Sequence, residues 1–153
     1  MKARSISVHN ELLDVIGRCL WCHVAMVDSD GKPYVIPMNF GFKDDIIYLH
    51  GAGNGKKIDI LTKNPAVCIN FSTDHLLRYQ NENVACSWSM KYRSVIAYGN
   101  VEFIENAEQK ESALHLVMAR YAKQNFKFNP PSIREVMVMK VKAEKLEGRV
   151  YGY

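Results

Sequence analysis

The sequence lacks several features that would place it in particular classes of protein. Among its 153 residues, no apolar run approaches the roughly 20 that a membrane-spanning helix needs. No block of five like charges occurs and the net charge is only +4, so the sequence does not demand a nucleic-acid partner. The basic N-terminus has no apolar signal-peptide core. We therefore expect a cytoplasmic protein with neither a membrane nor a nucleic-acid partner.

Cysteine is also scarce. The four cysteines, at positions 19, 22, 68 and 86, are too few for a disulfide scaffold in a chain of this length. Cys19, Cys22 and His23 match the spacing of covalent haem c attachment, but that chemistry requires an export signal. A zinc site would need a second Cys or His pair at ligand spacing. We interpret the pair as buried thiols before a strand, expect no metal, and keep haem as the alternative.

The overall composition is that of an ordinary globular protein. Hydrophobic residues make up 48% of the chain and charged residues 24%, and the length suits one domain with its own core. Neither an internal repeat nor a long linker divides the sequence. We therefore expect a single domain over residues 1–153.

Hydrophobic alternation predicts a mainly β structure. Three helices are expected: one that Ser7 caps, one over 56–63, and one that a capping box at Asn106 and Gln109 begins. Many short strands with one long helix after them predict a small antiparallel β-barrel with peripheral helices. The expected strands lie at 24–27, 34–40, 46–49, 66–72, 84–88, 92–104 and 135–146, with loops at 73–83 and 124–134.

A segment rich in glycine and lysine, Tyr48 to Pro65, carries the clearest functional signal. A strand leads into a loop with glycines at 51, 53 and 55, and Lys56 and Lys57 then open a helical pattern. Glycines let backbone N–H groups approach an anion, a helix start adds a partial positive charge, and lysine adds a full one. The segment predicts a phosphate site. The alternative is a glycine-rich turn with two solvated lysines.

Two common nucleotide motifs do not fit this segment. A P-loop needs four residues between its glycines, followed by Lys and a hydroxyl residue. Here three residues separate Gly51 from Gly55, and Lys57 stands at the hydroxyl position. The Rossmann fingerprint, Gly-x-Gly-x-x-Gly, is absent because the glycines alternate with single residues. The residues alone therefore leave the phosphate ligand open.

Four segments have an order and spacing typical of one protein family: 31–38 (GKPYVIPM), 49–59, 64–68 and 92–99. In this order and spacing, over roughly residues 10 to 125, they resemble the split-barrel flavin proteins related to pyridoxamine 5′-phosphate oxidase. The likeness is greatest to the 5-nitroimidazole-resistance (Nim-type) branch. The resemblance implies a split β-barrel of the Greek-key antiparallel, FMN-binding type. It also implies a homodimer that holds FMN, or alternatively FAD, in a cleft between subunits.

The resemblance further implies three groups of cofactor-binding residues. The flavin phosphate would contact His50, Gly51, Asn54, Gly55, Lys56 and Lys57. The isoalloxazine ring would lie along the strand formed by Pro37, Met38, Asn39 and Phe40. This strand offers backbone groups to the polar edge of the ring and apolar side chains to its face. The partner subunit would contribute Trp88, Arg93 and Ser94. In the alternative, Trp88 belongs to the core and Arg93 is only a surface charge.

His50 is the predicted reactive residue, because imidazole can bind a phosphate or transfer a proton near neutral pH. In the alternative it only caps the strand end. The leading hypothesis is an FMN-dependent oxidoreductase that passes electrons from a reduced nicotinamide to a small acceptor, such as a nitroaromatic drug. The alternatives are a flavin- or haem-binding module without turnover, a pyridoxamine-phosphate-oxidase-like enzyme, and an interaction domain without a cofactor.

Overall fold

The computed structural model describes residues 2–153 and is mainly antiparallel β, as the sequence predicts. The strands are β1 (Ala3–Ile6), β2 (Cys22–Val27), β3 (Pro33–Met38), β4 (Phe40–Lys43), β5 (Ile46–Ala52), β6 (Ala66–Arg78), β7 (Ser89–Ile104), β8 (Val136–Lys142) and β9 (Lys145–Tyr151). The helices are α1 (His9–Arg18), α2 (Lys56–Lys63), α3 (Ala107–Met118) and α4 (Pro130–Glu135), with a 3₁₀ turn η1 at Ala85–Ser87.

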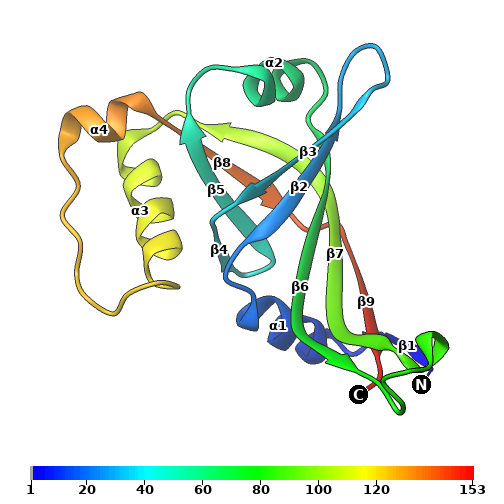
Figure 1. The fold of residues 1–153 in the computed structure, drawn as a ribbon. Helices are drawn as coiled ribbons and strands as arrows, with labels where there is room; N and C mark the ends of the chain where they lie inside the picture. The colour runs from blue at the N-terminus through cyan, green and yellow to red at the C-terminus, as the bar shows by residue number, and fades with distance from the viewer. Residues whose placement is uncertain (1) are drawn as a thin grey trace.

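All strands belong to one open sheet, whose main path runs β3-β2-β6-β7-β8-β5-β4. The long strand β7 pairs with β9 over Tyr92–Tyr98 and with β8 over Val101–Ile104. Strand β1 adds to the outer side of β9. The two ends of the path, β3 and β4, are consecutive in the chain and meet at Asn39, so the sheet bends back on itself (Figure 1).

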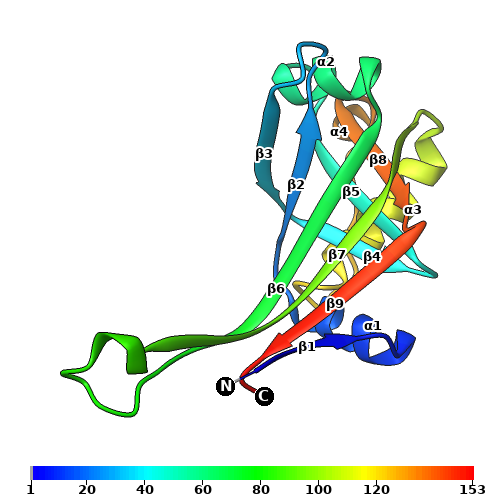
Figure 2. The ribbon, with the colours of Figure 1, turned by 90° about the vertical axis from the view of Figure 1, so that its right-hand side faces the viewer.

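The main core fills the inside of the bent sheet. Ile47, Leu49, Ile69, Phe71 and Met139 are fully buried there. Burying one such side chain stabilises the fold by about 1.5–3 kcal/mol. Helix α1 covers one end of the sheet with an apolar face of Leu12, Val15 and Ile16, and Figure 2 shows it beside β1 and β9. Val8 caps this helix rather than Ser7, because the Val8 carbonyl accepts from Glu11 and Leu12.

A second apolar cluster lies under α3 and α4, on the outer face of β5 and β8. It contains Leu114, Ile133 and Val138. The Asn106 side chain caps α3 by accepting from the Gln109 amide at 3.0 Å, as the sequence predicts. Helix α4 was expected to be a loop because of its two prolines. Proline is in fact favoured in a first helical turn, where its missing N–H group would have no partner.

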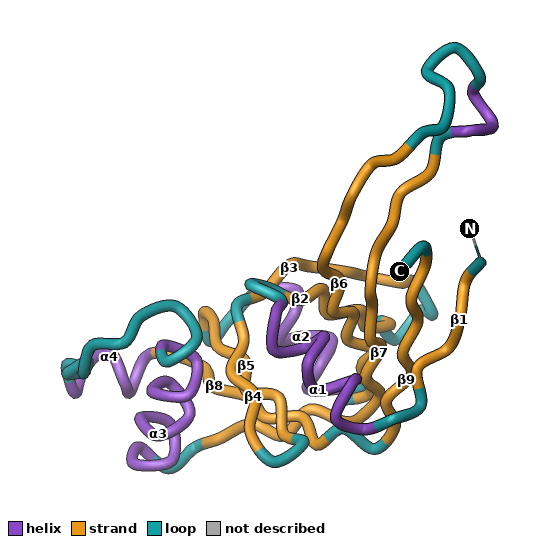
Figure 3. The backbone as a smooth tube through the Cα atoms, turned by 90° about the horizontal axis from the view of Figure 1, so that it is seen from below, coloured by secondary structure: helices purple, strands orange, loops and turns teal. Residues whose placement is uncertain are grey.

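The far ends of β6 and β7 and the turn between them, residues 76–91, extend beyond the sheet as a two-stranded hairpin, which we call the arm (Figures 2 and 3). The expected loop over 73–83 is therefore partly strand, since β6 runs to Arg78 after a register shift between Thr73 and Leu76. The prediction of a strand at 84–88 is wrong, because this range contains the 3₁₀ turn η1. The Ser87 hydroxyl donates to the Asn81 carbonyl at 2.6 Å, and this local turn replaces the ladder.

Two other expected strands are each divided in the structure. The range 34–40 is split into β3 and β4 at Asn39, and the range 135–146 turns at Ala143 and Glu144. Both turn amides are satisfied, because Ala143 donates to the Asp45 carbonyl and Glu144 to the Tyr98 carbonyl. Within residues 2–153, no helix is both long and apolar enough to cross a membrane.

Candidate functional site

The glycine- and lysine-rich loop joins the end of β5 to the start of α2. Gly55 precedes the helix with φ +96° and ψ 174°, a backbone conformation that only glycine adopts without strain. Its carbonyl accepts from Ile58 at 2.9 Å and from Asp59 at 3.1 Å. The amide groups of Lys56 and Lys57 begin the helix and have no intrahelical acceptor. The loop thus offers backbone donors and the positive end of a helix.

The two lysines of the loop have different surroundings. Lys57 is half-buried, and its Nζ lies so close to Gly51 that a Cβ there would meet it. Burial lowers the pKa of Lys57. Neither lysine has an ion-pair partner within residues 2–153, although the Lys56 Nζ lies 4.7 Å from the Tyr34 ring centroid. A half-buried cation without an ion-pair partner, in a loop that also has free amide groups, is suited to an anion.

His50 lies next to this loop in sequence, but its side chain is on the other face of β5. Leu49 is in the main core, whereas His50 helps to line a cavity of about 210 Å³ beneath α3 and α4. The His50 Nδ1 is buried and makes no hydrogen bond. Burial, and secondly the charge of Lys57, lowers the pKa of His50 below its usual value of 6.5. The His50 side chain makes no hydrogen bond that could cap the strand end.

The predicted ring-binding strand is the corner between β3 and β4. Pro37 and Asn39 are exposed, whereas Met38 and Phe40 are buried in the core. The Phe40 ring meets Phe71 edge-on with centroids 4.8 Å apart, and its amide donates to the Tyr121 hydroxyl at 3.3 Å. In this chain the side chains of Met38 and Phe40 pack in the core, and their contact with a flavin ring remains a prediction. Strand alternation turns both side chains inward.

The residues expected from the partner subunit lie on or near the arm. Trp88 is 39% exposed, stacks on Tyr79 with centroids 4.2 Å apart, and donates from Nε1 to the Glu82 carbonyl. It is therefore not a core residue. Arg93 is more than a surface charge, because it is half-buried and pairs with Asp74 at 2.8 Å. Ser94 is half-buried on β7.

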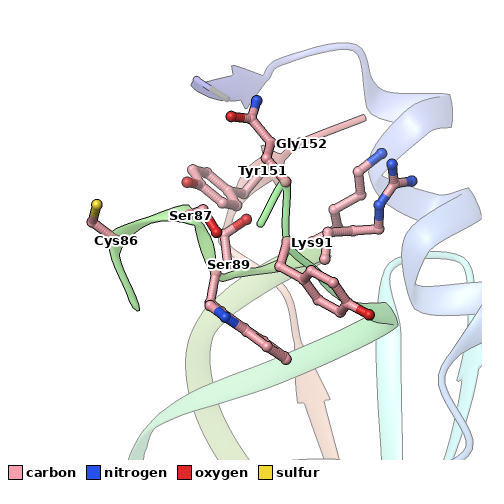
Figure 4. A pocket seen from close by; sticks show the side chains of 10 residues that line it. Cys86, Ser87, Ser89, Lys91, Tyr151 and Gly152 are labelled. Atoms are coloured by element: carbon pink, nitrogen blue, oxygen red, sulfur yellow. The ribbon is translucent and has the colours of Figure 1, made fainter. Parts of the chain in front are cut away.

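A hollow of about 470 Å³ lies along the arm, between its turn and the C-terminal residues Tyr151 and Gly152 (Figure 4). Its lining includes Trp88, Lys91 and Tyr151, and no sequence pattern could indicate it, because β6, β7 and the C-terminal residues meet there only in the fold. The arm and α2 lie at opposite ends of the molecule (Figures 1 and 2). One chain therefore does not bring Trp88 to the loop at Lys57.

Cys19 and Cys22 are buried thiols. Burial raises the pKa of Cys19 to about 11 and that of Cys22 to about 12. Their Sγ atoms donate to the carbonyls of Val15 and Met38. Both thiols are buried and hydrogen-bonded, as expected for buried thiols before a strand. In the part of the chain that the structure describes, no three His, Cys, Asp or Glu side chains are grouped to hold a metal.

Sequence reasoning missed Arg120 and Tyr121, which follow α3. Arg120 donates to the carbonyls of Ile16, Gly17 and Cys19, at the end of α1. The Tyr121 hydroxyl donates to the Leu20 carbonyl at 2.6 Å. Together they tie α3 to α1 and to the β3–β4 corner. The contacts join residues about a hundred positions apart, so no local pattern could have indicated them.

Comparisons with known proteins agree on one family. The sequence model described as pyridoxamine 5′-phosphate oxidase matches residues 9–150. A candidate 5-nitroimidazole antibiotic resistance protein from Bacteroides thetaiotaomicron is 40% identical with a TM-score of 0.88, over 97% of this chain and 87% of that chain. No curated protein matches.

Two more distant structures share the fold. The flavocytochrome Anf3 from Azotobacter vinelandii is 19% identical with a TM-score of 0.82, over 97% of this chain and 70% of that one. An FAD-binding protein from Mesorhizobium loti is 21% identical with a TM-score of 0.71, over 99% of this chain and all of the other. On the family match and the 40% identity, the chain belongs to the pyridoxamine 5′-phosphate oxidase family and is similar to a candidate 5-nitroimidazole resistance protein.

Proposed function

We propose that the protein is an FMN-binding oxidoreductase that acts as a homodimer. The observation that carries the proposal is the half-buried Lys57, which has no ion-pair partner among residues 2–153 and lies against Gly51 near the start of α2. A buried cation is unfavourable unless it is paired. The phosphate of a flavin mononucleotide supplies the missing charge.

The loop has the donors that a phosphate needs. The amides of Lys56 and Lys57 are free of intrahelical partners, and the Lys57 ammonium adds a full charge. A hydrogen bond to a charged group contributes about 1.5–3 kcal/mol. Gly51, Asn54 and Gly55 would give the phosphate access to the backbone, and Lys56 would add long-range attraction. The residues present therefore fit the phosphate end of FMN.

The ring would lie along the corner at Pro37–Phe40. Because the side chains of Met38 and Phe40 are buried, only their backbone could contact the ring. The exposed side chain of Asn39 is then the best polar contact for the ring. The Phe40 amide already donates to Tyr121 and is not free. The finer fold assignment, a Greek-key split barrel of the FMN-binding type over residues 1–153, is part of this proposal. The open sheet that bends at Asn39 supports it.

A second copy of the chain would complete the site. Trp88, Arg93 and Ser94 lie away from the loop at Lys57 within one chain, so only a partner subunit could bring them to the same flavin. The arm also exposes apolar side chains, which is unfavourable for a free hairpin in water. They are Leu76, Leu77, Tyr79, Val84, Trp88 and Met90.

The bound flavin would supply electron transfer from a reduced nicotinamide to a small acceptor. We propose a nitroaromatic acceptor, which the 40% identity to a candidate 5-nitroimidazole resistance protein supports. His50 is the proposed proton-transferring residue. Burial lowers its pKa and favours the neutral imidazole, which can accept a proton. Its side chain faces the cavity beneath α3 and α4, so the acceptor would have to approach from that side of β5.

Anaerobic reduction tests the activity. The FMN-loaded protein is mixed with NADH or with NADPH and the flavin absorbance is followed; a nitroaromatic compound is then added. We expect bleaching by one nicotinamide, followed by recovery of the absorbance as the nitro compound is reduced. Bound flavin that neither nicotinamide reduces would contradict the oxidoreductase and leave a flavin-binding module without turnover.

A further inference from the structure

The foot of the arm is a bulge with an unfavourable backbone conformation. Between the paired residues on either side, β6 has two residues, Asp74 and His75, where β7 has only Tyr92. An extra residue of this kind bends a strand. Asp74 also has φ +56°, a left-handed conformation that is unfavourable for a residue other than glycine and persists only where its surroundings hold it. The arm leaves the sheet directly after this bulge (Figure 2).

The side chain of Asp74 binds two arginines that come from different elements. Its Oδ2 accepts from Arg18 Nη1, at the end of α1, and from Arg93 Nη1, on β7, the latter at 2.8 Å. The side chains of Asp74 and Arg93 are 22% and 25% exposed, so water and salt screen this pair less than a surface pair. Asp74 therefore ties both strands at the foot of the arm to the helix that covers the end of the sheet.

Tyr153, which follows β9, contacts the same bulge. Its hydroxyl donates to the backbone carbonyl of Asp74 at 2.6 Å. Its ring is also close to two cations of β7, because the ring centroid lies 4.0 Å from Arg93 Cζ and 4.8 Å from Lys91 Nζ. A cation is attracted to the face of an aromatic ring. The bulge is thus held through the side chain of Asp74, through its backbone and through the strand opposite.

We propose that Asp74 is a positioning residue that forms, with Arg18, Arg93 and Tyr153, a latch that fixes the direction of the arm. A two-stranded hairpin has little stability of its own in water, so the arm needs an anchor at its foot to keep one direction. The latch lies within one chain and needs no flavin. Its use, which is to place Trp88 and Arg93 at the flavin of a partner subunit, rests on the proposed function.

A distance between two nitroxide labels measures the direction of the arm. Cys86, in the turn of the arm, is exposed, and Ser112→Cys places the second label on the outside of α3. The other thiols are buried or half-buried, and Cys68→Ser removes the half-buried one. Pulsed electron spin resonance gives the distribution of the distance in the monomer without FMN, which Leu77→Arg supplies where the wild type is a dimer. We expect one narrow peak.

Variants of the latch should widen this peak. Asp74→Asn should widen the distribution at least about twofold, because the arm then samples several directions. Asparagine has nearly the same size and tolerates the same left-handed backbone, so this change removes only the charge that binds the arginines. Tyr153→Phe removes one hydroxyl and should widen the distribution less. Asp14→Asn is the matched control, because Asp14 also pairs with Arg18, at 2.7 Å, but is exposed and lies away from the bulge.

Three results would overturn the latch. The first is a broad distribution in the protein with all four latch residues intact. The second is a peak that stays narrow in Asp74→Asn. The third is equal widening in Asp14→Asn, which would assign the effect to Arg18 alone. Thermal unfolding of each variant verifies that the sheet and its core are intact before the distances are compared.

The use of the latch is tested separately, by titration of the unlabelled protein with FMN. Asp74→Asn should weaken FMN affinity about threefold, because Arg93 loses the charge-assisted bond that positions it, and Asp14→Asn should not. Unchanged FMN affinity in Asp74→Asn, together with a widened distance, would contradict this use and keep the latch. Wild-type protein that binds no FMN would contradict the proposed function, whereas the distances would still decide whether the latch exists.

Discussion

Lys57 carries its charge in a half-buried position beside Gly51. Its Nζ lies so close to Gly51 that a Cβ there would meet it, and burial lowers its pKa. Lys56, its neighbour in the same helical turn, is exposed and lies over the Tyr34 ring. The two lysines look equivalent in the sequence, but only Lys57 has the environment of a ligand-binding charge.

This difference predicts unequal effects on flavin binding. Lys57→Ala should weaken FMN affinity at least about tenfold, because a charge-assisted contact is removed. Lys56→Ala should weaken it less, because an exposed charge is screened by water and salt. Quenching of flavin fluorescence measures both. Lys63→Ala, in the last turn of the same helix, is the control, and an equal loss in all three variants would contradict the assignment.

His50 should make the stability of the protein depend on pH. Its pKa in the folded protein is lowered below 6.5, so the unfolded chain takes up a proton on this ring first. Stability is then fully present above the unfolded pKa and falls as the pH drops towards the folded pKa. The free energy of unfolding in urea, at about pH 7.5 and about pH 5, measures the loss. His50→Phe should lose less on acidification; an equal loss would show that His50 does not contribute.

At the scale of elements, the packing of α3 on β4 depends on Gly41. A Cβ there would lie 2.8 Å from the Val117 nitrogen and 2.9 Å from the Leu116 carbonyl carbon, both backbone atoms that cannot move alone. This contact sets how closely α3 approaches the sheet. It thereby fixes one wall of the cavity and the position of Arg120 beyond the helix.

Gly41→Ala should therefore destabilise the protein by about 1–3 kcal/mol through overpacking. Gly17→Ala is a matched control, because Gly17 is helical and has nothing within 4 Å of its Cβ position. That change should stabilise by about 0.5–1 kcal/mol, since alanine loses less entropy in a helix. Thermal unfolding measures both, and a neutral Gly41→Ala would mean that α3 is not held this closely.

Much of the element pattern could be predicted from the sequence, and the failures have physical causes. Alternation locates β5 and most of β6 and β7, and the cap at Asn106 is correctly placed. Alternation cannot show where a strand turns a corner, as at Asn39, because both halves keep the same pattern. It also cannot show which face of β5 meets α3, and this decides the surroundings of His50.

At the scale of the whole molecule, a single chain does not explain why the arm exposes so many apolar side chains. It projects beyond the sheet (Figure 3) and exposes Leu76, Leu77 and Trp88. A two-stranded hairpin with exposed apolar residues has little stability of its own in water. The candidate site is divided in the same way, with the phosphate loop at one end and Trp88 at the other. A second copy would account for both.

The arm predicts an effect on oligomeric state. Leu77→Arg places a charge on an arm residue that is 54% exposed in the single chain, and it should shift a dimer towards monomer in sedimentation experiments. Leu20→Arg is the control, at a position 61% exposed but outside the arm. Wild-type protein that sediments as a monomer would contradict the proposed homodimer. It would also contradict the proposed roles of Trp88, Arg93 and Ser94 at the partner's flavin.

The most direct test of the central claim is the visible absorption spectrum of the freshly purified protein, with release and identification of any chromophore. We expect a flavin spectrum, FMN as the released compound, and loss of the yellow colour in Lys57→Ala. Release of FAD would keep a flavin site but contradict the mononucleotide. A colourless protein that also fails to bind added FMN would contradict the claim and leave the loop from Gly51 to Lys57 as a turn.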